Sequence, residues 1–353
     1  MLEIWRAGGS STGGSAQLAQ EIEAEGWDGQ MFMDSQSLAA DPYVQMGVWA
    51  ASTSRIKLSP GVTNPITRNL AVTAASAVTV HAVSGGRAVL GIGRGDSALA
   101  YLGLAPARLD AFERSLLNLQ ALLRGDEIPF ENFGERGVGE PSIEELSLGA
   151  RPTGVKLKWL PEGLPKVPLD VAATGPKVIA MAACIAERVT FSVGADVERT
   201  EWALAIARAA TAEDVSYGAQ LIVVCHPDDA TALEVAMSMA PALARFQVMQ
   251  GEAVGPRDAG DASSYGAIRS GYDMTKHGGA HERNRLTHGA LSPDFVRRFA
   301  IVGSPDHCTE RLLELRKVGL ERFVIVGPGF YPPEWGDAAN LFSREVMPAL
   351  RAS

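Results

Sequence analysis

The sequence predicts an α/β protein built around a single (β/α)8 barrel. Short apolar runs alternate with longer amphipathic segments about eight times, and no run of strands occurs without helices between them. Strands that alternate with helices form parallel sheets, and eight such units close into a barrel. The composition does not shift along the 353 residues, so we expect one domain over 1–353. A doubly wound open sheet is the alternative.

The expected strands are short apolar runs that end in small or polar residues. Runs that are apolar at successive positions indicate strands buried on both faces, as in parallel sheets. In chain order they cover residues 2–6, 30–33, 55–59, 87–92, 168–174, 188–193, 219–225 and 322–326, with a shorter apolar segment at 299–303.

The expected helices begin at capping residues and end at glycines or at polar turns. Ser15, Asp41 and Asn69 stand where side-chain oxygens can cap the first three helices, and Gly26 stands where the first one ends. The helices cover residues 15–26, 41–52, 69–83, 107–123, a segment from 176, 197–210, 227–250, 305–318 and 340–350.

Two segments interrupt the alternation. Residues 125–166 are rich in glycine and proline and are predicted to lie over the strand ends, with a hairpin. Residues 252–291 are polar and rich in glycine, and they are predicted to form a lid.

Composition excludes several classes of protein. A formal net charge of -9 argues against nucleic acid or an anionic membrane surface as a partner. No apolar run is long enough to span a membrane, and the first residues do not have the layout of a signal peptide. Cys184, Cys225 and Cys308 lie far apart, as buried free thiols do in a reducing compartment. We therefore expect a soluble cytoplasmic protein.

The segment from Arg87 to Gly103 carries the strongest sign of a ligand site. An apolar strand runs into Gly91, Gly93 and Gly95, so a flat or phosphorylated ligand can approach the backbone closely. Asp96 follows and can cap the next helix, whose amides point back to the same place. The spacing differs from a dinucleotide fingerprint. The alternative is an ordinary turn in which Asp96 is only an N-cap.

The other strand ends are also lined by small residues. This pattern suits a broad planar ligand across the barrel mouth, where barrel enzymes place their active sites. Thr174, Gly175 and Pro176 open a helix with free amides and form a competent phosphate seat, and Gly194 is similarly placed one unit later. Each of these can also be an ordinary turn.

The sequence lacks the pattern of a nucleophilic enzyme, which predicts that a cofactor carries the chemistry. His277, His281 and His288 lie together in the second insertion, but the paired glycines after His277 argue against a metal-binding helix, so no metal site is predicted. His277 could gate the site, contact substrate or lie in a solvated loop. Asp34 and Asp96 could form a carboxylate pair, bind a heterocycle edge or cap helices. The candidate catalytic residues are Asp34, Asp96 and His277.

Two segments resemble the bacterial luciferase-like flavin-dependent oxidoreductases. They are Gly-Val-Thr-Asn-Pro-Ile-Thr-Arg at 61–68 and Ser-Gly-Gly-Arg-Ala-Val-Leu-Gly-Ile-Gly-Arg-Gly-Asp at 84–96. The motifs are most similar to the deazaflavin (coenzyme F420)-dependent branch typified by methylenetetrahydromethanopterin reductase, and residues 171–177 and 300–305 also match it.

The resemblance implies a TIM barrel that holds an isoalloxazine-type ring at the strand ends. It also implies a non-prolyl cis peptide after the third strand, which maps onto Gly61 and Val62. The cofactor-binding residues predicted from the residues and the resemblance together are Asp34, Gly61, Val62, Thr63, Asn64, Gly93, Arg94, Gly95, Asp96, Ala173, Thr174, Gly175, Pro176 and Gly194.

The chain departs from the reductase in places that concern the substrate. Trp5 and Arg6 stand where the reductase has an acid, and Arg94 and Ser97 also differ from its pattern. These departures weaken the expectation of a pterin substrate, and Arg6 and Arg94 would suit an anionic or strongly polar one.

The expected function is F420-dependent hydride transfer between C5 of the deazaflavin and a small organic substrate. The alternative is an FMN-dependent monooxygenase supplied by a separate flavin reductase, and a third possibility is a non-catalytic flavin-binding barrel. The acidic tail of F420 should seek cations, for which Lys177 and the basic cluster at 151–166 are candidates. Helices 41–52 and 69–83 carry more apolar side chains than one buried face requires, and the resemblance implies a homodimer there.

Overall fold

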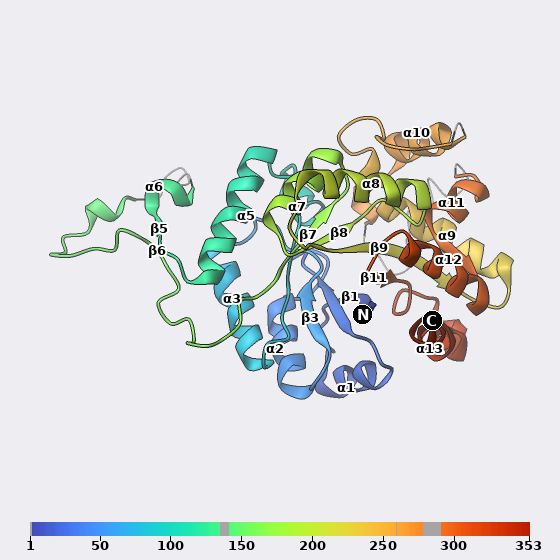
Figure 1. Ribbon diagram of the computed structural model, residues 1–353, viewed down its shortest axis with the longest axis horizontal. Helices are drawn as coiled ribbons and strands as arrows, with labels where there is room; N and C mark the ends of the chain where they lie inside the picture. Colours follow the sequence, from blue (N-terminus) through green and yellow to red (C-terminus); the bar gives the residue numbers. More distant parts are fainter. Residues whose placement is uncertain (1, 135–140, 259, 278–290) are drawn as a thin grey trace.

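A barrel of eight parallel strands with helices around it forms the centre of the molecule (Figure 1). The computed structural model describes residues 2–134, 141–258, 260–277 and 291–353. Around the barrel the strands follow the order β3-β2-β1-β11-β9-β8-β7-β4. Their bounds are β1 (Glu3–Gly9), β2 (Gly29–Met33), β3 (Lys57–Pro60), β4 (Leu90–Ile92), β7 (Leu169–Ala173), β8 (Arg188–Phe191), β9 (Ser216–Cys225) and β11 (Arg322–Val326).

Backbone bridges close the ring between β3 and β4. Leu58 pairs with Ala88, and Thr63 pairs with Ile92, both in parallel register. The Thr63 N–H donates to the Gly91 carbonyl at 3.0 Å. The predicted barrel is therefore confirmed, and the open sheet is excluded.

A ninth strand, β10 (Ile301–Gly303), pairs only with the carboxyl-terminal end of β9. The Ala195 N–H, just after β8, donates to the Phe299 carbonyl just before β10. β10 therefore pairs with residues of β9 that lie beyond those paired with β8. It corresponds to the short apolar segment predicted at 299–303.

Most helices lie where the sequence places them. Ser15, Asp41 and Asn69 each accept a hydrogen bond from the first turn of their helix, as predicted. The helices are α1 (Ala16–Ala24), α2 (Pro42–Ser52), α3 (Leu70–Val83), α4 (Ser97–Ala100), α5 (Leu109–Arg124), α6 (Phe130–Phe133), α7 (Pro176–Ile185), α8 (Val197–Ala210), α9 (Asp229–Ala244), α10 (Asp261–Gly271), α11 (Pro293–Phe299), α12 (Pro305–Lys317) and α13 (Met347–Ala352), with shorter 3-10 or π turns at η1 (Ile143–Glu145), η2 (Arg245–Gln247), η3 (Met274–Lys276), η5 (Pro333–Asn340) and η6 (Phe342–Val346).

Three features of the helices differ from the prediction. α9 ends at Ala244 and not near Gln250, because the chain continues as the 3-10 turn η2. In that turn the side-chain Nε2 of Gln247 donates to the Ser192 carbonyl just after β8. The helix α10 lies within the segment predicted as a lid, and α11 lies between that segment and the apolar run at 299–303, where the sequence predicts no helix. Cys225 and Cys308 are buried as expected, whereas Cys184 is exposed.

Charged side chains fill the barrel at the amino ends of its strands. The Arg322 guanidinium is fully buried and lies 3.2 Å from the Asp170 carboxylate, and Arg188 bridges Asp170 and Glu3 at 3.6 and 2.6 Å. Burial alone would raise the pKa of Glu3, but the hydrogen bonds and charges of Arg188 and Lys57 outweigh it and lower the pKa to about 2. These ions therefore compensate one another.

Glycines make room for the large side chains inside the barrel. A Cβ on Gly29 would lie 2.2 Å from the Trp5 ring, and a Cβ on Gly218 would lie 2.9 Å from the Arg322 side chain. Such contacts are impossible without a shift of the backbone, so Trp5 and Arg322 depend on these two glycines.

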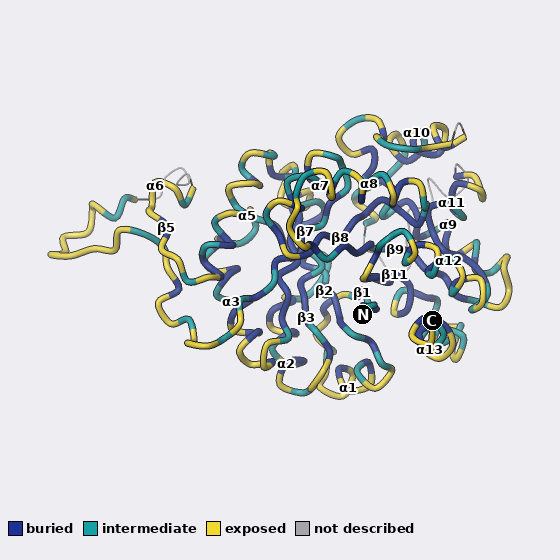
Figure 2. Tube along the Cα trace, in the orientation of Figure 1, coloured by how far each residue is buried: buried dark blue, intermediate teal, exposed yellow. Residues whose placement is uncertain are grey.

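The first insertion forms an arm that projects from the body beside α3 and α5 (Figure 1). It carries the predicted hairpin, β5 (Ile128–Pro129) with β6 (Gly154–Val155), and most of it is exposed (Figure 2). None of its described residues lines the cavity at the strand ends. The expectation that 125–166 covers the strand ends is therefore wrong, because the segment leaves the barrel side of α5 instead of crossing its mouth.

Candidate active site

A cavity of about 2120 Å³ opens at the carboxyl ends of the strands. Residues after β1, β2, β3, β4, β7, β8 and β11 line it, together with one side of α9 and with Tyr272, Lys276 and His277. Pockets for a single small ligand usually hold about 300–1,000 Å³. The cavity therefore has room for a large cofactor and a second molecule.

One wall of the cavity is bare backbone. Gly61, Val62, Gly93 and Gly95 line it, and the Gly61–Val62 peptide bond is cis, as the resemblance implied. Gly95 has a φ of +96°, and a Cβ there would lie 2.3 Å from Leu99. A Cβ on Gly93 would lie 3.0 Å from the Val62 side chain. A flat ligand can therefore approach this wall closely.

Asp34 and Asn64 line the same side of the cavity. The Asp34 carboxylate is 8% exposed and lies 3.6 Å from Arg68 Nε, and its Oδ2 accepts no hydrogen bond from the described residues. The Asn64 side chain is used locally, because its Oδ1 accepts from the Ile66 and Thr67 amides. Asp34 Oδ2 thus faces the Arg68 charge without accepting a hydrogen bond from the described residues, and Asn64 shapes the loop.

Three predicted cofactor residues do not line the cavity. Thr63 is fully buried, and its backbone closes the barrel against β4. The Ala173 carbonyl accepts from the Ser192 amide within the sheet, and Gly194 lies against Phe299, where a Cβ would be 2.7 Å from the ring. The other predicted residues, namely Asp34, Gly61, Val62, Asn64, Gly93, Arg94, Gly95, Asp96, Thr174, Gly175, Pro176 and His277, all line it.

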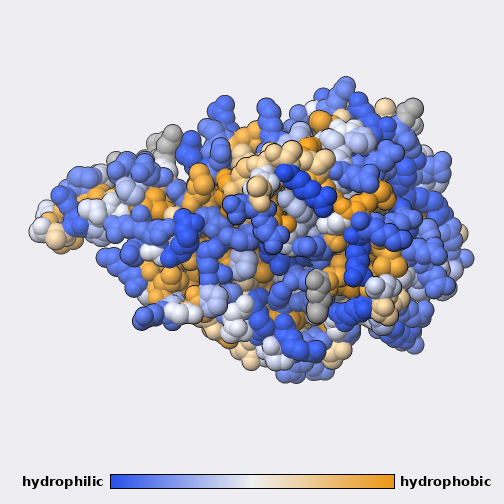
Figure 3. Space-filling model, viewed as in Figure 1, coloured by the Kyte–Doolittle hydropathy of each residue, from blue (hydrophilic) through white to orange (hydrophobic). Residues whose placement is uncertain are grey.

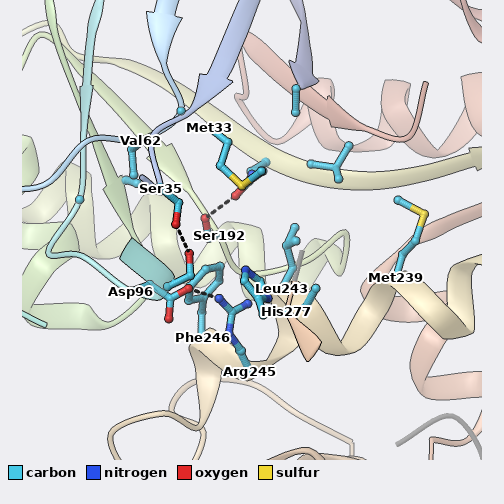
Figure 4. A pocket seen from close by; sticks show the side chains of 18 of the residues that line it. Met33, Ser35, Val62, Asp96, Ser192, Met239, Leu243, Arg245, Phe246 and His277 are labelled. Carbon is cyan, nitrogen blue, oxygen red and sulfur yellow. Dashed lines mark hydrogen bonds and ion pairs between the residues drawn. The ribbon is translucent and has the colours of Figure 1, made fainter. Parts of the chain in front are cut away.

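Asp96 forms an ion pair with Arg245 and does not cap α4 (Figure 4). Its Oδ2 meets Arg245 Nη2, and its Oδ1 is buried without a hydrogen-bond donor among the described residues. The Arg245 guanidinium is 4.4 Å from the Phe246 ring centre and 5.1 Å from that of Tyr272. Burial lowers the pKa of Arg245 to about 10, so it stays charged at neutral pH.

Sequence reasoning missed Arg245, although one signal was present. It is the only charged residue between Glu234 and Glu252, in an apolar helical segment. A lone charge on such a helix usually needs a buried partner, and here the partner comes from the turn after β4.

His277 lies in the cavity beside this ion pair. Its Nδ1 is 2.5 Å from the Tyr272 hydroxyl. Burial, together with the positive charge of Arg245, lowers the pKa of His277 to about 4. The imidazole is therefore neutral at neutral pH and can accept a proton. His281 and His288 lie outside the described residues.

The residues predicted to bind a phosphate line the cavity, whereas the basic cluster predicted to bind the acidic tail does not. Thr174, Gly175, Pro176 and Lys177 line the cavity, and α7 begins there with no side chain capping its first amides. Those amides are free to meet an anion. The basic cluster at 151–166 lies on and beside the arm, away from the cavity.

The two arginines predicted to suit an anion each donate part of their guanidinium to neutral acceptors within the protein. Arg6 does not line the cavity, and its Nη1 donates to Gln30 Oε1 at 3.3 Å. Arg94 lines the cavity, but its Nε donates to the Ala107 carbonyl and its Nη1 to Gln250. Of the two arginines expected to suit an anion, Arg94 therefore lines the cavity and Arg6 does not.

The described residues form neither a cluster of metal ligands nor a membrane-spanning helix. No three histidine, cysteine or acidic side chains there converge as a metal ion requires. Among the helices of this part of the chain, none is both long and apolar enough to cross a membrane.

The chain belongs to the luciferase-like monooxygenase family, whose model matches residues 5–322. This confirms the family resemblance that the glycine-rich motifs carried.

Three proteins that are similar to this chain are named as reductases or dehydrogenases. It is 27% identical to the 5,10-methylenetetrahydromethanopterin reductase of Methanolobus tindarius, over 94% of this chain and 95% of that protein. It is 24% identical to the F420-dependent glucose-6-phosphate dehydrogenase of Microbacterium testaceum, over 91% and 86% of the two chains. The F420-dependent tetrahydromethanopterin reductase of Methanopyrus kandleri has a similar fold, with a TM-score of 0.70, 20% identity and 99% of both chains covered.

Proposed function

We propose that this protein is an F420-dependent oxidoreductase that moves a hydride between the deazaflavin and a small organic substrate. The observation that carries the proposal is the bare backbone wall of Gly61, Val62, Gly93 and Gly95, beside buried carboxylate oxygens that lack donors. A relative with F420 dependence in its name, which aligns over most of the chain, supports the choice of cofactor.

The lining residues fit such a cofactor. Its ring would lie against the glycine wall, and ring N–H groups could donate to Asp34 Oδ2 or Asp96 Oδ1, which are buried acceptors without donors. Its phosphate would meet the free amides at the start of α7. Thr63, Ala173 and Gly194 would shape the site from behind. When bound, the deazaflavin gives or takes the hydride at C5.

The side chains of this protein would orient the reactants and move the proton. His277 is neutral, faces the cavity and is the group that we assign to proton exchange with the substrate. Asp96 holds Arg245 in place, and Arg245 disfavours the protonated form of His277. Asp34 would orient the ring.

The second candidate is an FMN-dependent monooxygenase with a separate flavin reductase, which the name of the family model favours. Fluorescence titration of the apo-protein with F420 and with FMN tests the two. Tight binding of F420 alone would support the proposal. Tight binding of FMN alone would replace it with the monooxygenase, and binding of neither would reject both.

Lys177 should distinguish the two cofactors. It is exposed at the first turn of α7, on the rim of the cavity. We expect Lys177→Gln to weaken F420 binding by up to about fivefold at low salt, because an exposed charge pair contributes about 0.2–1 kcal/mol. FMN binding should be affected less, because FMN lacks the acidic tail. Titration of both cofactors measures this, with Lys158→Gln on the arm as the control. If Lys177→Gln weakened the binding of F420 and of FMN equally, Lys177 would not be a residue that binds the acidic tail of F420.

We also propose a homodimer through α2 and α3. These helices pack side by side and contain no Asp, Glu, Lys or Arg, yet Val44 is 72% and Val72 is 52% exposed. Hydrophobic surface gathers near α3 in Figure 3. A contiguous apolar face of this kind marks an interface.

The double variant Val44→Glu, Val72→Glu is expected to be a monomer, because paired copies would bury like charges in an apolar contact. Light scattering after size-exclusion chromatography would show the mass halved. Leu102→Glu, a substitution of a residue that is 51% exposed elsewhere, should leave the mass unchanged. A wild-type monomer, or a double variant that still dimerises, would reject this interface.

We also propose that the chain forms a single domain over 1–353 and acts on a small molecule in the cytoplasm. The net charge of -9 argues against nucleic acid or an anionic membrane surface as a partner.

A further inference from the structure

The cavity continues beyond the cofactor wall along α9. The residues of α9 that line it are spaced three or four apart and form one stripe, which consists of Thr231, Glu234, Val235, Ser238, Met239, Ala242 and Leu243. Such spacing places side chains on one face of a helix. The cavity thus has a second wall that belongs to a single helical face.

α9 is unusual in being apolar on two faces. Ala232, Ala236 and Ala240 are fully buried and pack the helix against the molecule. Val235, Met239 and Leu243 lie on the neighbouring face and line the cavity. A surface helix needs only one apolar face for packing. Val235 and Met239 are each 8% exposed and Leu243 packs against the same buried cluster, so this face is packed in the molecule and also gives the cavity an apolar wall.

Aromatic side chains that pack against the same hydrophobic cluster also line the cavity. Phe330 and Trp335 follow β11 and line the same cavity, and the Trp335 ring is held 4.9 Å from that of Tyr331. Met239 and Leu243 reach toward the space from the side opposite Met33 and Val62 (Figure 4). We name the group Val235, Met239, Leu243, Phe330 and Trp335 the apolar lobe.

Charge in and around the apolar lobe is unfavourable for an anion. The exposed carboxylates of Glu234 and Glu334 flank it, each next to a lobe residue. The cations that line the described cavity are elsewhere, at Arg94, Lys177, Arg245 and Lys276. Of these, Arg245 follows the lobe residue Leu243 by two positions, and its charge is compensated by the ion pair with Asp96.

We propose that the apolar lobe binds the hydrocarbon part of an uncharged substrate and that the protein discriminates against sugar phosphates and other anionic substrates. This inference rests on the proposed function, because it makes the lobe the substrate side of the cofactor cavity. The volume of about 2120 Å³ leaves space for both molecules.

Nile red, a neutral apolar dye, provides a test that does not depend on turnover. Its fluorescence should rise on binding to the protein, with or without F420. Straight-chain alkan-2-ols should displace it with an affinity that rises about fourfold for each added methylene, because a buried methylene contributes about 0.8 kcal/mol. Glucose 6-phosphate should not displace it.

A matched pair of leucines locates the binding. Leu243→Asp should weaken Nile red binding at least about tenfold, because it places a charge in the lobe. Leu117→Asp, on an exposed part of α5, should not change it. Leu243→Ala, which keeps the lobe uncharged, should weaken binding by a smaller factor and serves if the aspartate variant does not fold.

The outcomes separate the two proposals. Absence of dye binding, no dependence on alcohol chain length, displacement by glucose 6-phosphate, or equal binding by Leu243→Asp and wild type would each overturn the apolar lobe. If the dye results hold while F420 does not bind, the lobe stands and the proposed function fails. If F420 binds and the dye results fail, only the lobe is rejected.

Discussion

Replacement of His277 by glutamine is expected to lower the kcat of F420-dependent turnover by about 10²–10⁴-fold, the usual contribution of a positioned acid–base group. Glutamine keeps a polar side chain of similar reach but cannot exchange a proton. The affinity for F420, measured by fluorescence titration, should not change. His307→Gln, at an exposed position on α12, is the control and should keep full activity.

The pH profile gives this prediction a second readout. The pKa of His277 is lowered to about 4 by burial and by Arg245, so the imidazole is neutral above that value and the rate should fall only as the pH approaches it. Arg245→Gln removes the positive charge and should move this acidic limb to higher pH. Full activity in His277→Gln, or a limb that Arg245→Gln does not move, would contradict the assignment.

Replacement of Arg322 by methionine is expected to lower the free energy of unfolding by about 3–5 kcal/mol, because it leaves the carboxylate of Asp170 buried with less compensation. Urea denaturation followed by circular dichroism measures this. Arg351→Met breaks a pair with Asp28 in which both side chains are exposed, and it should cost at most about 1 kcal/mol.

A double variant separates the charge from the packing. Arg322→Met with Asp170→Leu removes both buried charges and should recover much of the lost stability. A loss of less than about 1 kcal/mol in Arg322→Met alone would show that Arg188 and Thr190 suffice to hold the Asp170 carboxylate.

The barrel and the glycine wall could be predicted because local patterns determine them. Apolar runs mark the strands, and Gly61, Gly93 and Gly95 stand directly at the ends of β3 and β4. The caps at Ser15, Asp41 and Asn69 are equally local, since each acts within one helical turn.

The features that the sequence did not reveal depend on distant contacts. Asp96 was readable as an N-cap, but Arg245, 149 residues away, takes its carboxylate instead. Thr63, Ala173 and Gly194 carry plausible motifs, yet none of them lines the cavity, because they contact Ile92, Ser192 and Phe299 in neighbouring parts of the chain. The direction of the arm depends on where α5 ends against the barrel, which no local pattern encodes.

The buried ions and the cavity occupy opposite ends of the same eight strands. Glu3, Arg188 and Arg322 are the first residues of their strands, whereas the cavity is lined by residues near or beyond the last ones. Substitutions at sites that share no partners usually have additive effects. Residues that line the cavity can therefore be substituted without loss of the buried ion pairs at the amino ends of the strands. Members of the family can thus differ in the molecules that they bind and keep the same stabilising interactions.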